Sequence, residues 1–221
     1  MESKQNKADI NADKGVQERL LDTAEELFCE HGYKGTSIRD IASSAGCNIA
    51  SVNYYFGGKN NLYIEVWRRH LIPMRDARIA SIEKVMSQNQ GRIELENLLK
   101  SFADTFVGSM IDPDKSSRLS CLMAREYIDR HLPPKIFTNE VMTPTINAMQ
   151  AALMKTCPGL NDSKALMVIF SLVGQLVHLV HVRAMIERSG DDLGLPDLDT
   201  SETVEHIVEF SAAGIRAYSK G

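Results

Sequence analysis

The chain has 221 residues, of which 43% are hydrophobic, and its formal net charge is −4. This length allows one large or two modest domains with a real core, and the acidic balance excludes a protein that binds nucleic acid through its overall charge. The N-terminus is polar and no run of about 18 apolar residues occurs, so we expect a cytoplasmic protein with neither a membrane span nor a signal peptide.

Almost all of the chain has the periodicity of amphipathic helices, and no stretch alternates between apolar and polar residues as a strand would. A polar arm over residues 1–15 comes first and is expected to be flexible. Loops are expected over residues 111–117 and 189–201. The predicted helices, about nine in an all-α chain, span residues 16–31, 37–45, 48–56, 60 to about 88, 91–110, 118–130, 136–155, 164–188 and 202–218.

Two of these helices contain an internal proline, Pro73 and Pro144, and Pro73 should kink the long helix that begins near residue 60. We place the domain boundary in that helix. Residues 16–60 then form a three-helix N-terminal domain, and residues 61–221 form a larger helical domain.

The four cysteines lie far apart in the sequence, and no two of them form a CxxC pair. Such spacing is typical neither of a zinc site nor of a disulfide framework, so we expect reduced thiols and no metal or other cofactor. They are Cys29, Cys47, Cys121 and Cys157.

One stretch, GTSIRDIASSAGCNIASVNYYFGGK, has the spacing of a helix-turn-helix. Ala42 is small enough to let two helices approach closely. Gly46 suits a left-handed turn, and Val52 can fill the angle between the helices. Thr36 or Ser37 can cap the first helix and Asn48 the second. The alternative is two ordinary amphipathic helices joined by a glycine turn.

The second of these helices places Ile49, Val52 and Phe56 on its predicted inner face, and its outer face carries no charge. A helix that enters the major groove needs small residues for close approach and hydrogen-bonding tips for bases and phosphates. Ser51 and Asn53 can reach base edges. The tyrosine hydroxyls and Lys59, just past the helix end, can contact phosphates.

The charge pattern allows such a surface. From residue 31 to residue 69 five cations face two acids, a local excess of three positive charges, whereas residues 189–221 hold seven acids against two cations. A phosphate-facing surface therefore fits the N-terminal segment better than the C-terminal one.

The run LLDTAEELFCEHGYKGTSIRDIASSAGCNIASVNYYFGGKNNLYIEV resembles the N-terminal domain of TetR-family transcriptional repressors. The resemblance implies a DNA-binding head on a helical body that binds a ligand and dimerises. It also implies which residues contact DNA. The chain departs from the family pattern at Asn53, where the family often has an aromatic residue. With Asn48 as the cap, the candidate DNA-binding residues are Thr36, Ser37, Arg39, Asn48, Ile49, Ala50, Ser51, Asn53, Tyr54, Tyr55 and Lys59.

The segments REYIDRHLPPKIFTNEVMTPTINAM and GQLVH resemble the CecR-type subgroup of this family, whose members are implicated in antibiotic susceptibility and transport genes. The family likeness further implies a homodimer in which the last two helices of each subunit form a four-helix interface. Residues 164–188 and 202–218 suit that role, because the first of these helices is apolar nearly all round.

Polar residues inside apolar helical segments are candidates for orienting a small-molecule effector. Since His178 and His181 are three residues apart, a metal site there is an alternative to hydrogen bonds across the dimer, although no third ligand is visible. The candidate ligand-binding residues are Arg125, Tyr127, Gln175 and His178, with Glu126 beside them.

Three classes of function remain open: a ligand-responsive repressor, a DNA-binding dimer that senses no ligand, and a helical enzyme. No GxSxG, HExxH or phosphate-binding glycine loop is present, so the enzyme has the least support. The sequence favours a repressor that leaves a palindromic double-stranded DNA operator when a small molecule binds its C-terminal domain.

Overall fold

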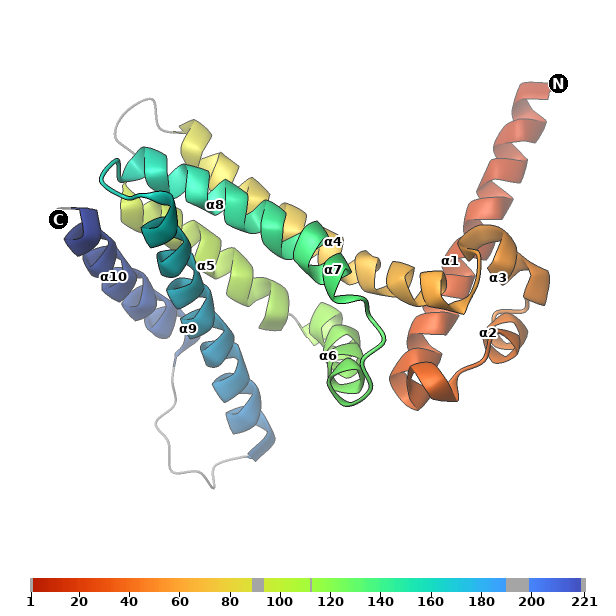
Figure 1. Ribbon diagram of the computed structural model, residues 1–221. Helices are drawn as coiled ribbons and strands as arrows, with labels where there is room; N and C mark the ends of the chain where they lie inside the picture. Colours follow the sequence, from red (N-terminus) through yellow and green to blue (C-terminus); the bar gives the residue numbers. More distant parts are fainter. Residues whose placement is uncertain (1, 89–93, 112, 190–198, 220–221) are drawn as a thin grey trace. The chain divides into compact units, whose positions relative to one another are not determined.

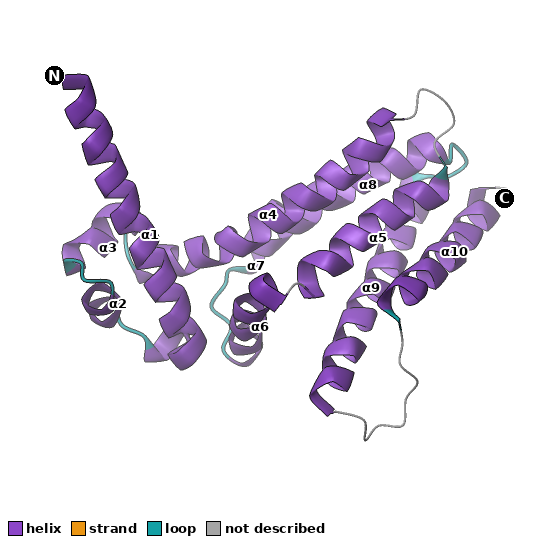
Figure 2. Ribbon diagram, turned by 180° about the vertical axis from the view of Figure 1, so that it is seen from behind, coloured by secondary structure: helices purple, strands orange, loops and turns teal. Residues whose placement is uncertain are grey.

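The computed structural model describes residues 2–88, 94–111, 113–189 and 199–219. Within these ranges the chain forms helices and loops without a strand, which confirms the all-α fold class (Figures 1 and 2). The elements are α1 (Glu2–Gly35), α2 (Ile38–Ser44), α3 (Ile49–Phe56), α4 (Lys59–Gln88), α5 (Leu95–Ile111), α6 (Pro113–Ile128), α7 (Pro134–Phe137), the π-helix η1 (Thr138–Met142), α8 (Thr143–Thr156), α9 (Asp162–Ser189) and α10 (Thr200–Ser219).

The chain divides into two compact units. The first, the head unit, comprises Met1–Leu71 and Asp114–Ile136, and the second, the body unit, comprises Ile72–Pro113 and Phe137–Gly221. The division falls inside α4 between Leu71 and Ile72, next to Pro73. The sequence-based boundary after residue 60 stays a prediction. However, α6 belongs to the head unit, whereas segmentation of the sequence groups all residues after 60 together.

In the head unit α1 buries the face that its periodicity predicts, since Leu20, Ala24 and Phe28 are at most 1% exposed. Gly32 has φ 72° and interrupts the helical backbone, as expected. α1 begins at Glu2, so the segment expected to be a flexible arm, residues 1–15, is helical from its second residue; its flexibility stays a prediction. Residues 2–14 contain neither glycine nor proline, so nothing in them stops the helix from extending in this direction.

In the body unit α5, α8, α9 and α10 pack around one apolar core, to which α4 contributes Ile82 (Figure 1). Phe102, Leu153 and Leu176 are among its most buried side chains. The helical periodicity of these segments predicts this core, because each helix places its apolar residues three and four positions apart.

Two segments depart from the predicted helix ends. The loop expected over residues 111–117 is helical from Pro113, a residue well suited to the first turn because its missing N–H has no partner there. The helix expected over 136–155 is divided into α7, η1 and α8, and Pro144 lies in the first turn of α8. The other predicted loop, 189–201, lies largely outside the described residues.

The stretch Asp162–Ile186 of α9 is long and apolar enough to cross a membrane by length and composition, with a mean hydropathy of 2.0, and 33% of its most apolar part is buried. The stretch is nevertheless not an unbroken run of apolar residues, because Ser171, Gln175 and His178 interrupt it, so the expectation of no membrane span stays a prediction. Leu172, Leu176 and Leu179 belong to the core of the body unit. A core helix of a globular protein passes the same test.

Candidate nucleic-acid interface

The helix α2 begins with a reciprocal cap. The Ser37 hydroxyl accepts a hydrogen bond from the Asp40 N–H at 3.1 Å, and the Asp40 carboxylate accepts one from the Ser37 N–H at 3.0 Å. These bonds lower the pKa of Asp40, because they favour the ionised carboxylate. The structure thus identifies Ser37 as the N-cap and fixes the start of α2.

The turn to α3 follows the predicted helix-turn-helix spacing. Ala42 is 3% exposed, Gly46 has φ 62°, and Val52 is fully buried. The Asn48 side chain accepts a hydrogen bond from the Ala50 N–H at 2.9 Å, so the predicted cap of α3 is confirmed. A non-glycine residue at position 46 would be strained in this left-handed backbone.

The inner face of α3 is narrower than the sequence suggests. Val52 and Phe56 are buried, but Ile49 is 47% exposed, so its predicted place on the inner face is wrong. As the first residue of α3 it lies beyond the part of the helix that these two side chains bury. Its exposure is compatible with the other role considered for it, contact with a thymine methyl group.

The outer face of α3 is uncharged and open to solvent. Ala50 and Asn53 are exposed, Ser51 and Tyr55 are half-buried, and Tyr54 is 77% exposed. The rings of Tyr54 and Tyr55 meet edge to face at 4.9 Å between centroids. In a free protein, uncovered aromatic rings beside small polar groups form a surface suited to stacking and hydrogen bonding.

Thr36 is placed differently from the other candidates. It is 2% exposed, and its hydroxyl donates to the carbonyl oxygens of Leu27 and Gly32 at 3.0 and 2.9 Å. The Thr36 hydroxyl therefore binds the end of α1 and is not available as a donor to DNA, although Thr36 is among the candidate DNA-binding residues. Ser37 and Arg39, which come next in the chain, are exposed.

Lys59 is the first residue of α4, directly after the glycine pair that ends α3. Its ammonium lies 4.1 Å from the centroid of the Tyr33 ring, and its partial burial lowers its pKa. Such a cation–π contact holds the side chain beside the candidate surface. A phosphate would compete with Tyr33 for the same charge.

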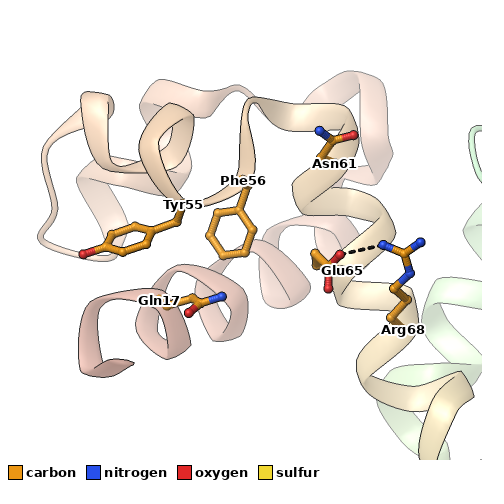
Figure 3. Close-up of a pocket in the computed structure, with 6 residues that line it drawn as sticks. All are labelled: Gln17, Tyr55, Phe56, Asn61, Glu65 and Arg68. Atoms are coloured by element: carbon orange, nitrogen blue, oxygen red, sulfur yellow. Dashed lines mark hydrogen bonds and ion pairs between the residues drawn. The ribbon is translucent and has the colours of Figure 1, made fainter. Parts of the chain in front are cut away.

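An open hollow of about 480 Å³ lies beside the C-terminal end of α3 (Figure 3). Tyr55 and Phe56 reach it from α3, and the Arg68 guanidinium in it donates to the Glu65 carboxylate at 2.7 Å. Arg68 is thus already paired and adds less to the positive field than its formal charge suggests. The lining residues are Gln17, Tyr55, Phe56, Asn61, Glu65 and Arg68.

The attachment of α6 to α1 is a feature that sequence reasoning misses. Arg125 donates to the carbonyl oxygens of Cys29 and Glu30 at 2.9 and 2.6 Å, near the end of the regular part of α1. The Cys121 thiol donates to the same Cys29 carbonyl at 3.4 Å. Burial, followed by the hydrogen bond with Cys121, raises the pKa of the Cys29 thiol to about 12. No local pattern signals these contacts, because they join residues 92 to 96 positions apart.

A buried ion pair lies where α1 meets α4. Glu25 is 2% exposed, and its carboxylate lies 2.8 Å from His70 Nε2. Arg69 and Arg118 approach it at 3.6 and 4.0 Å. A buried carboxylate needs such partners, because isolating it from water is costly. The cluster thus ties α1, α4 and α6 together.

Family models match both parts of the chain. The model for bacterial regulatory proteins of the tetR family matches residues 20–66. The model for the C-terminal domain of the HTH-type transcriptional dual regulator CecR matches residues 95–215, or 121 of the 221 residues. The chain belongs to the TetR family. Its second half is of the CecR type, as the sequence resemblance indicates.

Individual relatives agree with this assignment. Over 168 residues the chain is 26% identical to the HTH-type transcriptional dual regulator CecR of Shigella flexneri, a match that covers 73% of this chain and 74% of that protein. Over 47 residues it is 44% identical to the probable HTH-type transcriptional regulator YttP of Bacillus subtilis, but this match covers 21% of the chain and 23% of the relative.

Solved structures show the same TetR-family fold. A structure described as a TetR-family transcriptional regulator from Mesorhizobium loti superposes with a TM-score of 0.64 at 18% identity, covering 93% of this chain and 96% of that one. This likeness shows the fold alone. The family models and the CecR relative show that the chain is a DNA-binding transcriptional regulator, of a family that is not one of enzymes.

The four candidate ligand-binding residues do not gather in either unit. Arg125 and Tyr127 belong to the head unit, where Arg125 bonds to α1 and Tyr127 is 82% exposed. Gln175 and His178 belong to the body unit, where Gln175 donates to the Ser171 carbonyl of its own helix and His178 is exposed.

Two further polar residues beside these candidates also have partners within the protein. Glu126 accepts a hydrogen bond from the Tyr63 hydroxyl at 2.8 Å, so it helps to hold α6 against α4 in the head unit. His181 Nδ1 lies 2.9 Å from the Val177 carbonyl oxygen of its own helix. Across the described residues, no group of three or more His, Cys, Asp or Glu side chains is arranged to hold a metal ion.

Proposed function

We propose that the chain is a cytoplasmic homodimeric repressor that binds a palindromic operator and leaves it when a small molecule binds the body unit. The observation that carries the proposal is the exposed, uncharged outer face of α3, on a helix-turn-helix whose turn and caps are in place. A recognition helix of this kind fits the width of the major groove.

The exposed and half-buried candidate residues of α2, α3 and the start of α4 divide by their chemistry. Arg39 and Lys59 carry positive charge, and Tyr54 and Tyr55 carry hydroxyls, so these four are suited to phosphates. Ser51 and Asn53 have the donors and acceptors that read base edges, and Ile49 and Ala50 fit thymine methyl groups. Ser37 offers the helix N-terminus of α2 to a phosphate.

A homodimer is supported by large apolar side chains that the chain leaves uncovered on α9 and α10. Met167 and Phe170 of α9 are 64% and 51% exposed, and Phe210 of α10 is 65% exposed. Met167, Phe170 and His178 recur at helical spacing along one side of α9. A second copy that covers this surface would place two heads on half-sites about 34 Å apart, or a multiple of that distance.

The helix α4 supports a route from effector to DNA, because the one continuous helix Lys59–Gln88 contributes residues to both units. An effector that binds one position of α4 more tightly than another would change the population of heads able to bind the operator. The shift in this population cannot exceed what the difference in the effector's affinity for the two positions of α4 allows.

The test is fluorescence anisotropy of the purified protein with a duplex from the region beside its own gene, at two salt concentrations. We expect saturable, salt-sensitive binding to one palindrome. Tyr54→Ala should weaken it about tenfold. Lys59→Ala should weaken it by a similar factor and reduce the salt slope by about one.

Tyr127→Ala is the matched control, since Tyr127 is 82% exposed but lies on α6. It should bind the operator as the parent protein does. Weak binding that is equal for every duplex, or Tyr54→Ala and Lys59→Ala variants that bind like the parent, would contradict the proposed interface.

A further inference from the structure

Arg78 is an unusual residue in the body unit. It is 7% exposed, although arginine is almost never fully buried without a partner. Within the described parts of the chain, its Nε has no hydrogen-bond partner and no acidic side chain forms an ion pair with it. Burial alone lowers its pKa to about 10, so the guanidinium remains charged at neutral pH.

The surroundings of Arg78 are apolar and aromatic. Its guanidinium carbon lies 3.9 Å from the centroid of the Phe106 ring of α5. Both Phe106 and Ile82, the residue one turn along α4, belong to the core of the body unit. A cation–π contact compensates only part of what a guanidinium loses when it leaves water.

The polar groups nearest in the sequence are occupied without using the guanidinium. The Ser81 hydroxyl donates to the Arg78 carbonyl oxygen at 2.7 Å, and the Ser101 hydroxyl donates to the Ser81 carbonyl at 3.2 Å. These bonds join α4 to α5 at this level. The hydrogen bonds near Arg78 thus pair the backbone carbonyl groups and do not use its guanidinium.

Arg75, one turn before Arg78, shows the contrast. Its guanidinium forms an ion pair with Asp76 at 2.7 Å and donates to the Glu140 carbonyl of η1 at 3.0 Å. A π-helix such as η1 is rare and is frequently found at functional sites. Two arginines therefore lie on neighbouring turns of α4. Arg75 has polar partners, whereas the guanidinium of Arg78 has no ion-pair partner among the described residues.

We propose that Arg78 anchors the effector, and that the effector is a small organic molecule with one carboxylate and an apolar body. The carboxylate accepts two parallel hydrogen bonds from the guanidinium, and the apolar body lies against the aliphatic and aromatic side chains around it. This inference deepens the proposed sensing function and rests on it.

The charge count selects this class of ligand. Arg78 supplies one positive charge, and the nearest arginine in sequence, Arg75, is already neutralised by Asp76. A nucleotide or other polyphosphate would bring several negative charges against one guanidinium. A carboxylate with an apolar body matches both the single charge and the apolar surroundings.

Thermal unfolding of the full-length protein tests the assignment. The probes are octanoate, decanoate and dodecanoate, each compared with the alcohol of the same chain length. We expect at least one acid to raise Tm while its alcohol does not. In Arg78→Met the apparent affinity for that acid should fall about tenfold or more, because a charge-assisted pair is lost.

Two variants serve as controls. Arg75→Met removes an arginine one turn away and should keep the response to the acid. Arg78→Met without ligand should unfold at the same temperature as the parent or a higher one, because an unpaired buried charge is gone. If Arg78→Met does not fold, Arg78→Lys keeps the charge, loses the fork of donors and should show a weakened response.

The assignment is overturned if no acid stabilises the parent more than its alcohol, or if the acids stabilise Arg78→Met equally. Operator binding measured by anisotropy separates this failure from that of the sensing function. A protein that binds its operator and is released by some other compound keeps the sensing function and loses the ligand class. A protein that never binds a palindrome loses the sensing function itself.

Discussion

The helices α3 and α9 both leave side chains uncovered, but the chemistry of those side chains is opposite. The eight residues of α3 expose Asn53 and Tyr54, whereas α9 exposes Met167 and Phe170. Small polar and hydroxyl groups suit a hydrated, charged partner such as DNA. Large apolar groups suit a protein surface that excludes water. The difference indicates that the two units are built to meet different partners.

The interiors of the two units differ in how a buried charge is paired. The buried carboxylate of Glu25 in the head unit has His70 as a partner at 2.8 Å, whereas the buried guanidinium of Arg78 in the body unit has no ion-pair partner among the described residues. A buried charge is stable only when it is compensated. The head unit compensates its charge internally, and we expect the body unit to obtain compensation from a ligand.

The largest effect is expected from a charge placed on the apolar surface of α9 and α10. Phe210→Asp would bury a carboxylate between apolar side chains if the dimer formed. We expect a monomer by light scattering after gel filtration. Operator affinity should fall about a hundredfold or more, since one head alone makes half of the contacts.

Tyr127→Asp is the control for that substitution, because it adds the same charge to an exposed ring on α6. It should leave the molecular mass unchanged. A Phe210→Asp protein that remains a dimer would show that the uncovered face of α10 is not the interface.

A smaller effect is expected when the carboxylate of the buried ion pair, Glu25, is removed. Glu25→Ala leaves His70 and two neighbouring arginines without their shared carboxylate, so it should lower the free energy of unfolding by about 3 kcal/mol. Urea unfolding measures this loss. Glu26→Ala removes the next carboxylate, which is exposed and lies 3.4 Å from Arg118, and should cost about 0.5 kcal/mol or less. Equal losses in the two variants would argue against a compensated charge in the interior.

The smallest effect concerns the cap that starts α2. Ser37→Ala should lower the free energy of unfolding by about 1 kcal/mol at neutral pH. The pKa of Asp40 is lowered in the folded protein. The ionised carboxylate therefore contributes stability above its pKa in the unfolded chain, about 3.9, and this contribution is lost as the pH falls through its pKa in the folded protein.

Urea unfolding at neutral and acid pH tests the cap. The difference in the free energy of unfolding between the parent and Asp40→Asn should shrink at acid pH. There the parent carboxylate is protonated and is as neutral as the asparagine amide. A difference that stays constant down to the most acid pH at which the protein folds would show that the capping bonds do not depend on the ionised carboxylate.

Much of the head unit could be predicted because its signals are local. Ala42, Gly46 and Val52 act at fixed spacing along one short segment, and Asn48 caps a helix whose first turn follows it directly. Thr36 and Ile49 were harder to place. Whether a side chain at a helix end is buried depends on what packs beside it, and for Thr36 the decisive acceptors, Leu27 and Gly32, come from the preceding helix.

Local patterns are enough to predict the all-α class, the order of the helices and the place of the helix-turn-helix, because helical periodicity, caps and glycine turns act between residues close in the chain. Packing in three dimensions places α6 in the head unit and buries Arg78 without an ion-pair partner among the described residues. Both depend on contacts between residues far apart in the sequence, and no pattern of neighbouring residues predicts such contacts or the burial that they cause.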